Sequence, residues 1–221
     1  MKITKLWDGL EQIANGDYVL KGDLISEEEI EIDLDDRLVV RGKVEAKKSI
    51  KVGRALIAGD GIEAGCGIKA GDGIEAGCGI KAGDGIEAGC GIKAGWGIEA
   101  GWGIEAGDGI KAGDGIKAGW GIEAGCGIKA GDGIKAGDGI KAGWGIEAKT
   151  FIHSERRIFA GISLYRTNDD CDKTIKCAEL RKGEICFGDL IIVEPETVMT
   201  IAEIEAKLGI KNLKIKIEEG I

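Results

Sequence analysis

Gly59-Asp60-Gly61-Ile62-Glu63-Ala64 is the first of fifteen consecutive copies of one six-residue unit, Gly-X-Gly-Ile-Z-Ala, which end at Ala148. Position X is always Asp, Cys or Trp, and position Z is always Glu or Lys. Two glycines in six residues exclude a helix, because each would cost about 0.5–1 kcal/mol relative to alanine there. A strict short period of this kind indicates a repeat architecture.

The unit divides into a strand and a corner. Ile-Z-Ala is typical of a three-residue strand with apolar positions inside and a charge outside. Gly-X-Gly is typical of a corner, where positive φ and close backbone approach favour glycine. The alternation therefore predicts an all-β fold, a parallel β-solenoid in which each coil covers the next. Collagen is excluded because glycine is not at every third position, and the glycine-rich calcium-binding nonapeptide pattern does not occur.

The hexad frame extends beyond the perfect copies, with apolar residues six apart from Ile32 to Leu56 and again at Ile152 and Ile158. We therefore predict a solenoid over residues 30–160, an N-terminal cap at 1–29 and a C-terminal module at 161–221. Rungs of three units stack opposite Z charges in 7 of 12 pairs, and rungs of two units in 6 of 13. Because stacked like charges are unfavourable, triangular 18-residue rungs are favoured.

The two ends carry different patterns. Residues 4–15 have the spacing of an amphipathic helix, with Leu6, Leu10 and Ile13 on one face and Gly16 as its stop. We expect this helix, or residues 18–25 after it, to cover the first strand edge. Beyond Ala160 we predict strands at 157–166, 174–180, 184–193 and 212–217 and a helix at 197–208. This β-rich module could cap the solenoid, bind a partner or pair two subunits as a homodimer.

The hexads Val44-Glu45-Ala46, Ile50-Lys51-Val52 and Ile62-Glu63-Ala64 resemble two known solenoid families. One is the hexapeptide-repeat β-helix of acyltransferases, and the other is the β-helix of bactofilins, which are polymer-forming bacterial cytoskeletal proteins. The resemblance covers about residues 30–160 and is architectural, since the Gly-X-Gly corner departs from both patterns and residues 161–221 match neither. The near-identical units also look like those of small phage or mobile-element proteins.

The composition limits the partners and the compartment. A net charge of −9 argues against direct binding to nucleic acid or an anionic membrane and permits a basic protein partner. No apolar run reaches the roughly 18 residues of a membrane span. The N-terminus lacks an apolar signal region, so we expect a cytoplasmic protein. Seven cysteines, an odd number, favour free thiols over a disulfide framework.

Catalytic and metal-binding candidates are few. His153 is the only histidine, and the resemblance to acyltransferases would make it a general base. Its outward position without an acidic partner at a fixed spacing is more typical of a solvated histidine. The cysteines show no CxxC pair or nearby histidine, which zinc sites usually have; they are Cys66, Cys78, Cys90, Cys126, Cys171, Cys177 and Cys186. We expect no enzymatic activity, no cofactor and no metal.

Binding candidates occupy position X. Because X accepts Asp, it cannot lie in a dry core, so its tryptophans should be exposed at corners. These are Trp96, Trp102, Trp120 and Trp144, of which Trp102 stacks on Trp120 if each rung contains three units. Exposed tryptophans are typical of binding hot spots, although each indole could instead lie flat and shield its glycine neighbours. The acidic X residues are Asp60, Asp72, Asp84, Asp108, Asp114, Asp132 and Asp138.

The charges of the repeat allow two interpretations. Seven Asp and seven Glu against eight Lys give residues 59–148 a net charge of −6. This charge could serve solubility, or it could imitate the regular charge of DNA. The function we expect is a non-enzymatic protein-binding rod, most specifically a phage or mobile-element inhibitor of a host nucleic-acid-handling or defence complex. The alternative is a self-assembling, bactofilin-like scaffold, which the two expected caps disfavour.

Overall fold

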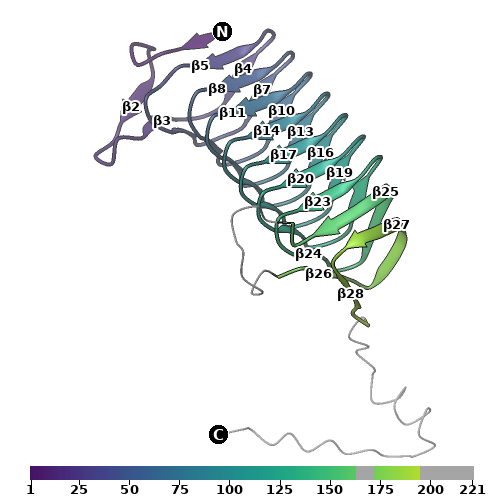
Figure 1. The fold of residues 1–221 in the computed structure, drawn as a ribbon. Helices are drawn as coiled ribbons and strands as arrows, with labels where there is room; N and C mark the ends of the chain where they lie inside the picture. The colour runs from purple at the N-terminus through teal and green to yellow at the C-terminus, as the bar shows by residue number, and fades with distance from the viewer. Residues whose placement is uncertain (163–171, 195–221) are drawn as a thin grey trace, which may run out of the picture.

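The computed structural model describes residues 1–162 and 172–194 (Figure 1). This part of the chain is an all-β solenoid without a helix, and its strands pair in parallel except at one N-terminal hairpin. Ile62 pairs with Ile80, and Ile80 pairs with Ile98, so paired residues are separated by three units of the repeat. Each rung of the perfect repeat therefore contains three strands, and the predicted 18-residue rung length is confirmed.

The strands stack in three ladders, which we call A, B and C. Ladder A contains β4 (Leu24–Ser26), β7 (Val44–Ala46), β10 (Ile62–Ala64), β13 (Ile80–Ala82), β16 (Ile98–Ala100), β19 (Ile116–Ala118) and β22 (Ile134–Ala136). Ladder B contains β1 (Lys2–Ile3), β5 (Ile30–Ile32), β8 (Ile50–Val52), β11 (Ile68–Ala70), β14 (Ile86–Ala88), β17 (Ile104–Ala106), β20 (Ile122–Ala124) and β23 (Ile140–Ala142).

Ladder C reaches from the N-terminal hairpin to the last described strand. It contains β2 (Leu10–Gln12), β3 (Tyr18–Leu20), β6 (Leu38–Val40), β9 (Leu56–Ala58), β12 (Ile74–Ala76), β15 (Ile92–Ala94), β18 (Ile110–Ala112), β21 (Ile128–Ala130), β24 (Ile146–Ala148), β26 (Thr174–Cys177) and β28 (Asp189–Ile192). Two longer strands, β25 (Phe151–Ala160) and β27 (Glu179–Phe187), continue ladders A and B across the corner between them.

The core consists of identical side chains stacked one rung above another. In each Ile-Z-Ala strand of the perfect repeat, the isoleucine and alanine are at most 3% exposed, and one continuous apolar cluster runs from Ile3 to Cys177. The Z side chain points outward, as the period of two predicts. The rungs therefore cover one another's apolar surface, and the charged positions contribute nothing to the interior.

The glycines of the repeat are required by close approach between rungs. A Cβ on Gly119 would lie 1.9 Å from the carbonyl oxygen of Gly101, whereas one on Gly121 would lie 3.4 Å from that of Gly139. The Gly119 amide also donates to the Ala100 carbonyl oxygen at 3.1 Å. Positive φ occurs only at glycines outside the perfect repeat in the described residues, so that part of the expectation for the corners is wrong.

The amphipathic helix predicted for residues 4–15 is wrong. Turns and the strand β2 occupy this segment, Leu6 is 94% exposed, and β2 pairs antiparallel with β3. Gly9 and Gly16 adopt φ values of 92° and 97°, which turns allow and a helix does not. A hairpin therefore covers the first edge of ladder C, and residues 18–26 already belong to the ladders.

The first rung, which contains β3, β4 and β5, is longer than a rung of the perfect repeat. Tyr18 pairs with Leu38, and Ile30 pairs with Ile50. These partners are therefore two residues further apart in the sequence than partners in the perfect repeat, which are three units apart. The extra length lies in the corner at residues 33–37, and the uninterrupted hexad frame begins at Leu38 rather than at Ile32. Arg37 donates two hydrogen bonds of 2.8 Å to the buried Asp17 carboxylate, which hold this corner. The Arg37 guanidinium lowers the pKa of Asp17 below its usual value.

Residues 172–194 continue the solenoid. Strand β26 stacks on β24, β27 on β25 and β28 on β26, all in parallel. The described part of the predicted C-terminal module therefore extends the ladders. Strand β26 lies within the predicted range 174–180, but the strand predicted at 157–166 begins at Phe151, and the range 184–193 is divided between β27 and β28. The predicted helix at 197–208 and the strand at 212–217 lie outside the described residues.

Candidate binding surface

Because rungs contain three units, every third X residue lies on the same corner. The AB corner carries Cys66, Asp84, Trp102, Trp120 and Asp138; the BC corner carries Asp72, Cys90, Asp108, Cys126 and Trp144; the CA corner carries Asp60, Cys78, Trp96, Asp114 and Asp132. Each X amide donates to the carbonyl oxygen of the X residue one rung before, as Trp120 does to Trp102 at 3.1 Å. The acidic X residues are therefore divided among three corners and do not form a single row.

Trp102 and Trp120 form a stacked pair, which we call the tryptophan pair. Their ring centroids are 5.9 Å apart with an interplanar angle of 15°, which confirms the predicted stacking. The two residues are 56% and 65% exposed, so most of each indole faces solvent. Trp96 is equally exposed but lies on the CA corner, and Trp144 is half-buried on the BC corner. The four tryptophans therefore do not form a single cluster.

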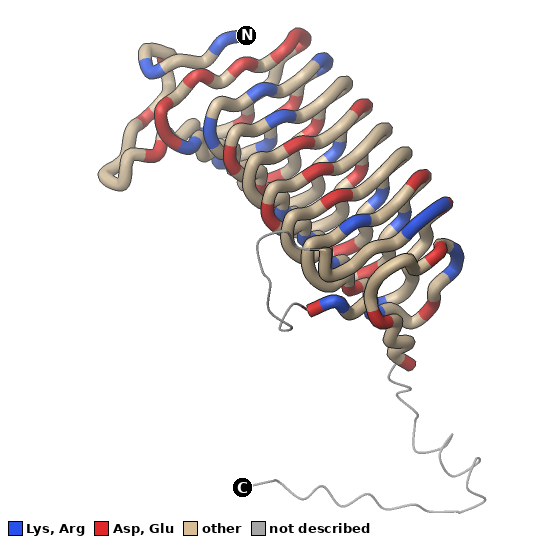
Figure 2. The backbone as a smooth tube through the Cα atoms, viewed as in Figure 1, with Lys and Arg blue, Asp and Glu red and all other residues tan. Residues whose placement is uncertain are grey.

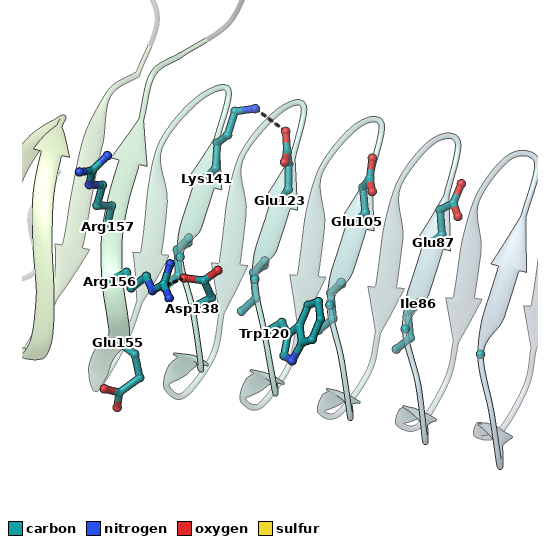
Figure 3. Close-up of a pocket in the computed structure, with 18 of the residues that line it drawn as sticks. Ile86, Glu87, Glu105, Trp120, Glu123, Asp138, Lys141, Glu155, Arg156 and Arg157 are labelled. Atoms are coloured by element: carbon teal, nitrogen blue, oxygen red, sulfur yellow. Dashed lines mark hydrogen bonds and ion pairs between the residues drawn. The ribbon is translucent and has the colours of Figure 1, made fainter.

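A groove runs along ladder B beside the tryptophan pair (Figure 3). Its floor is the backbone of the second glycine and the isoleucine of each unit, and Trp120 lines it at the AB corner. Glu87, Glu105 and Glu123 extend from successive strands in the same direction, and we call them the acidic row. Their register stacks like charge on like charge at both steps.

Lysines bracket the acidic row. Lys69 bonds to Glu87 at 2.7 Å, and Lys141 bonds to Glu123 at 2.5 Å. Glu105, between them, has no ion pair within the described part of the chain. The centre of ladder B is therefore an exposed carboxylate that no cation of the described residues neutralises.

Ladder C carries the opposite row. Lys93, Lys111 and Lys129 stack in register, and we call them the basic row. Glu75 bonds to Lys93 at 2.5 Å and Glu147 bonds to Lys129 at 2.9 Å. Ladder A instead begins its perfect repeat with strict alternation, Glu63, Lys81, Glu99 and Lys117. Sequence reasoning missed both rows, because it counted the pairs of Z residues three units apart and did not follow the Z residues along each ladder.

An ion-pair cluster lies at the end of ladder A, where β25 and β27 turn toward ladder B. Nε2 of His153 lies 2.8 Å from Oε1 of Glu155, and Lys182 donates to the same carboxylate. Lys182 first and His153 second lower the pKa of Glu155 from 4.5 to about 2. The outward position of His153 is confirmed, but it does have an acidic partner. The neighbouring Ser154 hydroxyl is buried and donates to the Asp138 carbonyl oxygen, so it is not presented to the His153–Glu155 pair.

The six described cysteines are free thiols, and Cys171 lies outside the described residues. Cys177 is buried, and this burial raises the pKa of its thiol. No group of three or more His, Cys, Asp or Glu side chains that could hold a metal ion occurs in residues 1–162 and 172–194. The same residues contain no helix with the length and apolarity needed to cross a membrane.

Comparison with known proteins found no matching family model, no matching curated protein and no matching solved structure. The resemblance to hexapeptide β-helices and bactofilins is therefore one of repeat architecture only. The function must be argued from the geometry of the chain itself.

Proposed function

We propose that this protein is a non-enzymatic rod that binds another protein through the tryptophan pair at the AB corner. The single observation that carries the proposal is the exposed stack of Trp102 on Trp120 beside an acidic row. Tryptophans at the centre of interfaces contribute more binding energy than most other residues. The two indoles stack on each other, so less conformational entropy is lost when a partner covers them than for two separate side chains.

The charges around the pair select the partner. Asp84 and Asp138 flank it along the AB corner, with Asp138 paired to Arg156 at 3.1 Å, and the acidic row lies beside it on ladder B. A partner with a basic surface fits the acidic row. We also propose a triangular cross-section for the rod, because each rung contributes one strand to each of three ladders.

The most specific form of the proposal is an inhibitor, encoded by a phage or mobile element, that blocks a nucleic-acid-handling protein of its host. Three carboxylates repeat along ladder B at a rung spacing of about 4.8 Å. Proteins that bind DNA present basic surfaces to a regular line of phosphates. A rigid line of carboxylates beside stacked aromatic rings could occupy such a surface and exclude the nucleic acid.

The test uses purified DNA-binding proteins with basic grooves as probes, passed over the immobilised rod in low salt. We expect at least one probe to bind and a short DNA duplex to displace it. Trp120→Ala should weaken that binding by at least about tenfold, as truncation of a central hot-spot residue does. The matched control is Trp96→Ala, because Trp96 is equally exposed on another corner and is not part of the stack.

Two results would overturn the proposal. One is that no probe binds at any salt concentration. The other is that Trp96→Ala and Trp120→Ala weaken binding equally, which would show that the stacked pair has no special role.

A self-assembling scaffold is the second candidate, and the last described strand favours it. Leu190, Ile191 and Ile192 of β28 are 41–51% exposed, and β28 pairs only with β26 among the described residues. An apolar strand edge of this kind can add a further strand. End-to-end growth, or a homodimer through residues 161–221, would use this edge, and Ile191→Lys would abolish it in light scattering. A fixed monomer in both forms would exclude this candidate.

A further inference from the structure

The outer rows of ladders B and C are complements of each other. Along ladder B the order is Lys69, Glu87, Glu105, Glu123 and Lys141, and along ladder C it is Glu75, Lys93, Lys111, Lys129 and Glu147. Every position of one row has the opposite charge at the same position of the other. The row of ladder B is visible in Figure 2 as three red segments bracketed by blue ones.

Both rows are unfavourable within a single rod. Glu105 stacks between two glutamates, and Lys111 stacks between two lysines. Like charges in directly paired positions destabilise a sheet. The repeat unit accepts either Glu or Lys at Z, and ladder A alternates over four rungs before Lys117 stacks on Lys135. Sites where a sequence departs from local favourability are often functional.

We infer that ladder B of one rod docks side by side on ladder C of a second copy of this chain. The five positions then form five opposite-charge pairs, with Glu105 facing the partner's Lys111 at the centre. Glu105 and Lys111 have no ion pair within the described part of the chain, so docking gives each a counter-charge that the single rod lacks. Because both rows read the same in either direction, the rods can lie parallel or antiparallel.

The contact between the two rods has a small area. A strand of three residues is about 10 Å long, and five stacked rungs extend about 24 Å along the rod. This area is below that of a standard stable interface. Association should therefore be weak, dependent on protein concentration, and reduced by salt that screens exposed charges.

The contact joins two different faces, so each docked rod keeps one free ladder B or one free ladder C. Such heterologous contacts produce rings or open assemblies rather than closed dimers. This inference goes beyond the proposed function and does not depend on it, because it would hold if the tryptophan pair bound nothing. It does imply that a second copy and a protein partner compete for ladder B.

Sedimentation velocity from micromolar to near-millimolar protein in low salt tests the inference. We expect the wild-type rod to sediment faster as its concentration rises and to return to monomer in high salt. Glu105→Lys and Lys111→Glu should each weaken self-association by about tenfold or more. Mixing the two variants should restore association. Ladder B of Glu105→Lys complements ladder C of Lys111→Glu at every position, and ladder B of Lys111→Glu complements ladder C of Glu105→Lys.

The double variant, with both changes in one chain, should also associate, because its rows alternate and still complement each other. Controls are Glu63→Lys and Lys135→Glu, which make the same charge changes at exposed Z positions of ladder A. Both controls should associate as the wild type does.

The inference is overturned if the wild type stays monomeric throughout or if Glu105→Lys associates as well as the wild type. It is also overturned if the mixed variants fail to associate. Assembly that Ile191→Lys abolishes and Glu105→Lys leaves unchanged would show end-to-end growth instead. None of these outcomes bears on the tryptophan pair, whose failure would appear in the probe experiment, either as no probe binding or as equal weakening by Trp120→Ala and Trp96→Ala.

Discussion

Ladders B and C have the same interior and opposite exteriors. Over the perfect repeat both present isoleucine and alanine to the core, at most 3% exposed. On the outside, the three central Z residues are glutamates in ladder B and lysines in ladder C. The comparison teaches that the inward positions determine the fold, while the outward positions can vary without changing it. We propose that the outward rows serve binding.

The largest expected effect is on the shared interior. Ile104→Ala in ladder B should lower the free energy of unfolding by about 2–5 kcal/mol, because it leaves a cavity in a closely packed stack. Ile110→Ala in ladder C should cost a similar amount, since the two isoleucines are equally buried. Chemical denaturation of both variants checks this prediction. A large difference between them would show that the two interiors are not equivalent.

The two glycines beside Trp120 should differ from each other. Gly119→Ala should destabilise the rod by about 1–3 kcal/mol, because its Cβ would meet the Gly101 carbonyl oxygen at 1.9 Å. Gly121→Ala places its Cβ 3.4 Å from the nearest carbonyl oxygen and should cost less than about 1 kcal/mol. Thermal unfolding of the pair checks the prediction. Equal losses would mean that close approach between rungs does not explain the first glycine.

A smaller, local effect is expected where β25 and β27 cross the corner from ladder A to ladder B. The pKa of Glu155 is lowered to about 2, first by Lys182 and then by His153. A lowered pKa in the folded state gives stability that is present above pH 4.5 and is lost as the pH falls from about 4.5 toward about 2. Titration of the Glu155 carboxyl by NMR should show a midpoint near 2. In Lys182→Met the midpoint should rise toward 4.5, and an unchanged midpoint would remove Lys182 as the main cause.

The sequence was sufficient to predict the strands, the inward isoleucines and the stacking of Trp102 on Trp120, because all three follow directly from the six-residue period. It was insufficient at the N-terminus, where the spacing of Leu6, Leu10 and Ile13 fits a helix face and also a hairpin. In the structure this segment forms a hairpin in which β2 pairs with β3, and not the helix that the spacing of the apolar residues suggested. The two extra positions of the first rung were missed because Ile32 and Leu34 are both apolar and both buried.

The outward rows were missed for a different reason. The Z residues three units apart were counted as pairs to choose the rung length, and this count does not show that the like-charged pairs are consecutive within ladders B and C. The His153–Glu155 pair was detectable, because residues two apart on a strand lie on the same side. The long strand β25, which crosses a corner, was not expected from a six-residue period with three-residue strands.

Thermal unfolding of Glu105→Lys at a protein concentration where the rod is monomeric tests most directly whether the like-charged rows cost the rod stability. The change replaces two stacked Glu–Glu pairs with two Glu–Lys pairs, so it should stabilise the rod by about 0.4–2 kcal/mol. Glu63→Lys is the control, because Glu63 stacks on Glu45 and on Lys81. The change turns the like-charged pair into an unlike pair and the unlike pair into a like-charged one, so it should have no net effect. A lower unfolding midpoint for Glu105→Lys would show that the acidic row supports the fold, and the binding role of the outward rows would then lose its basis.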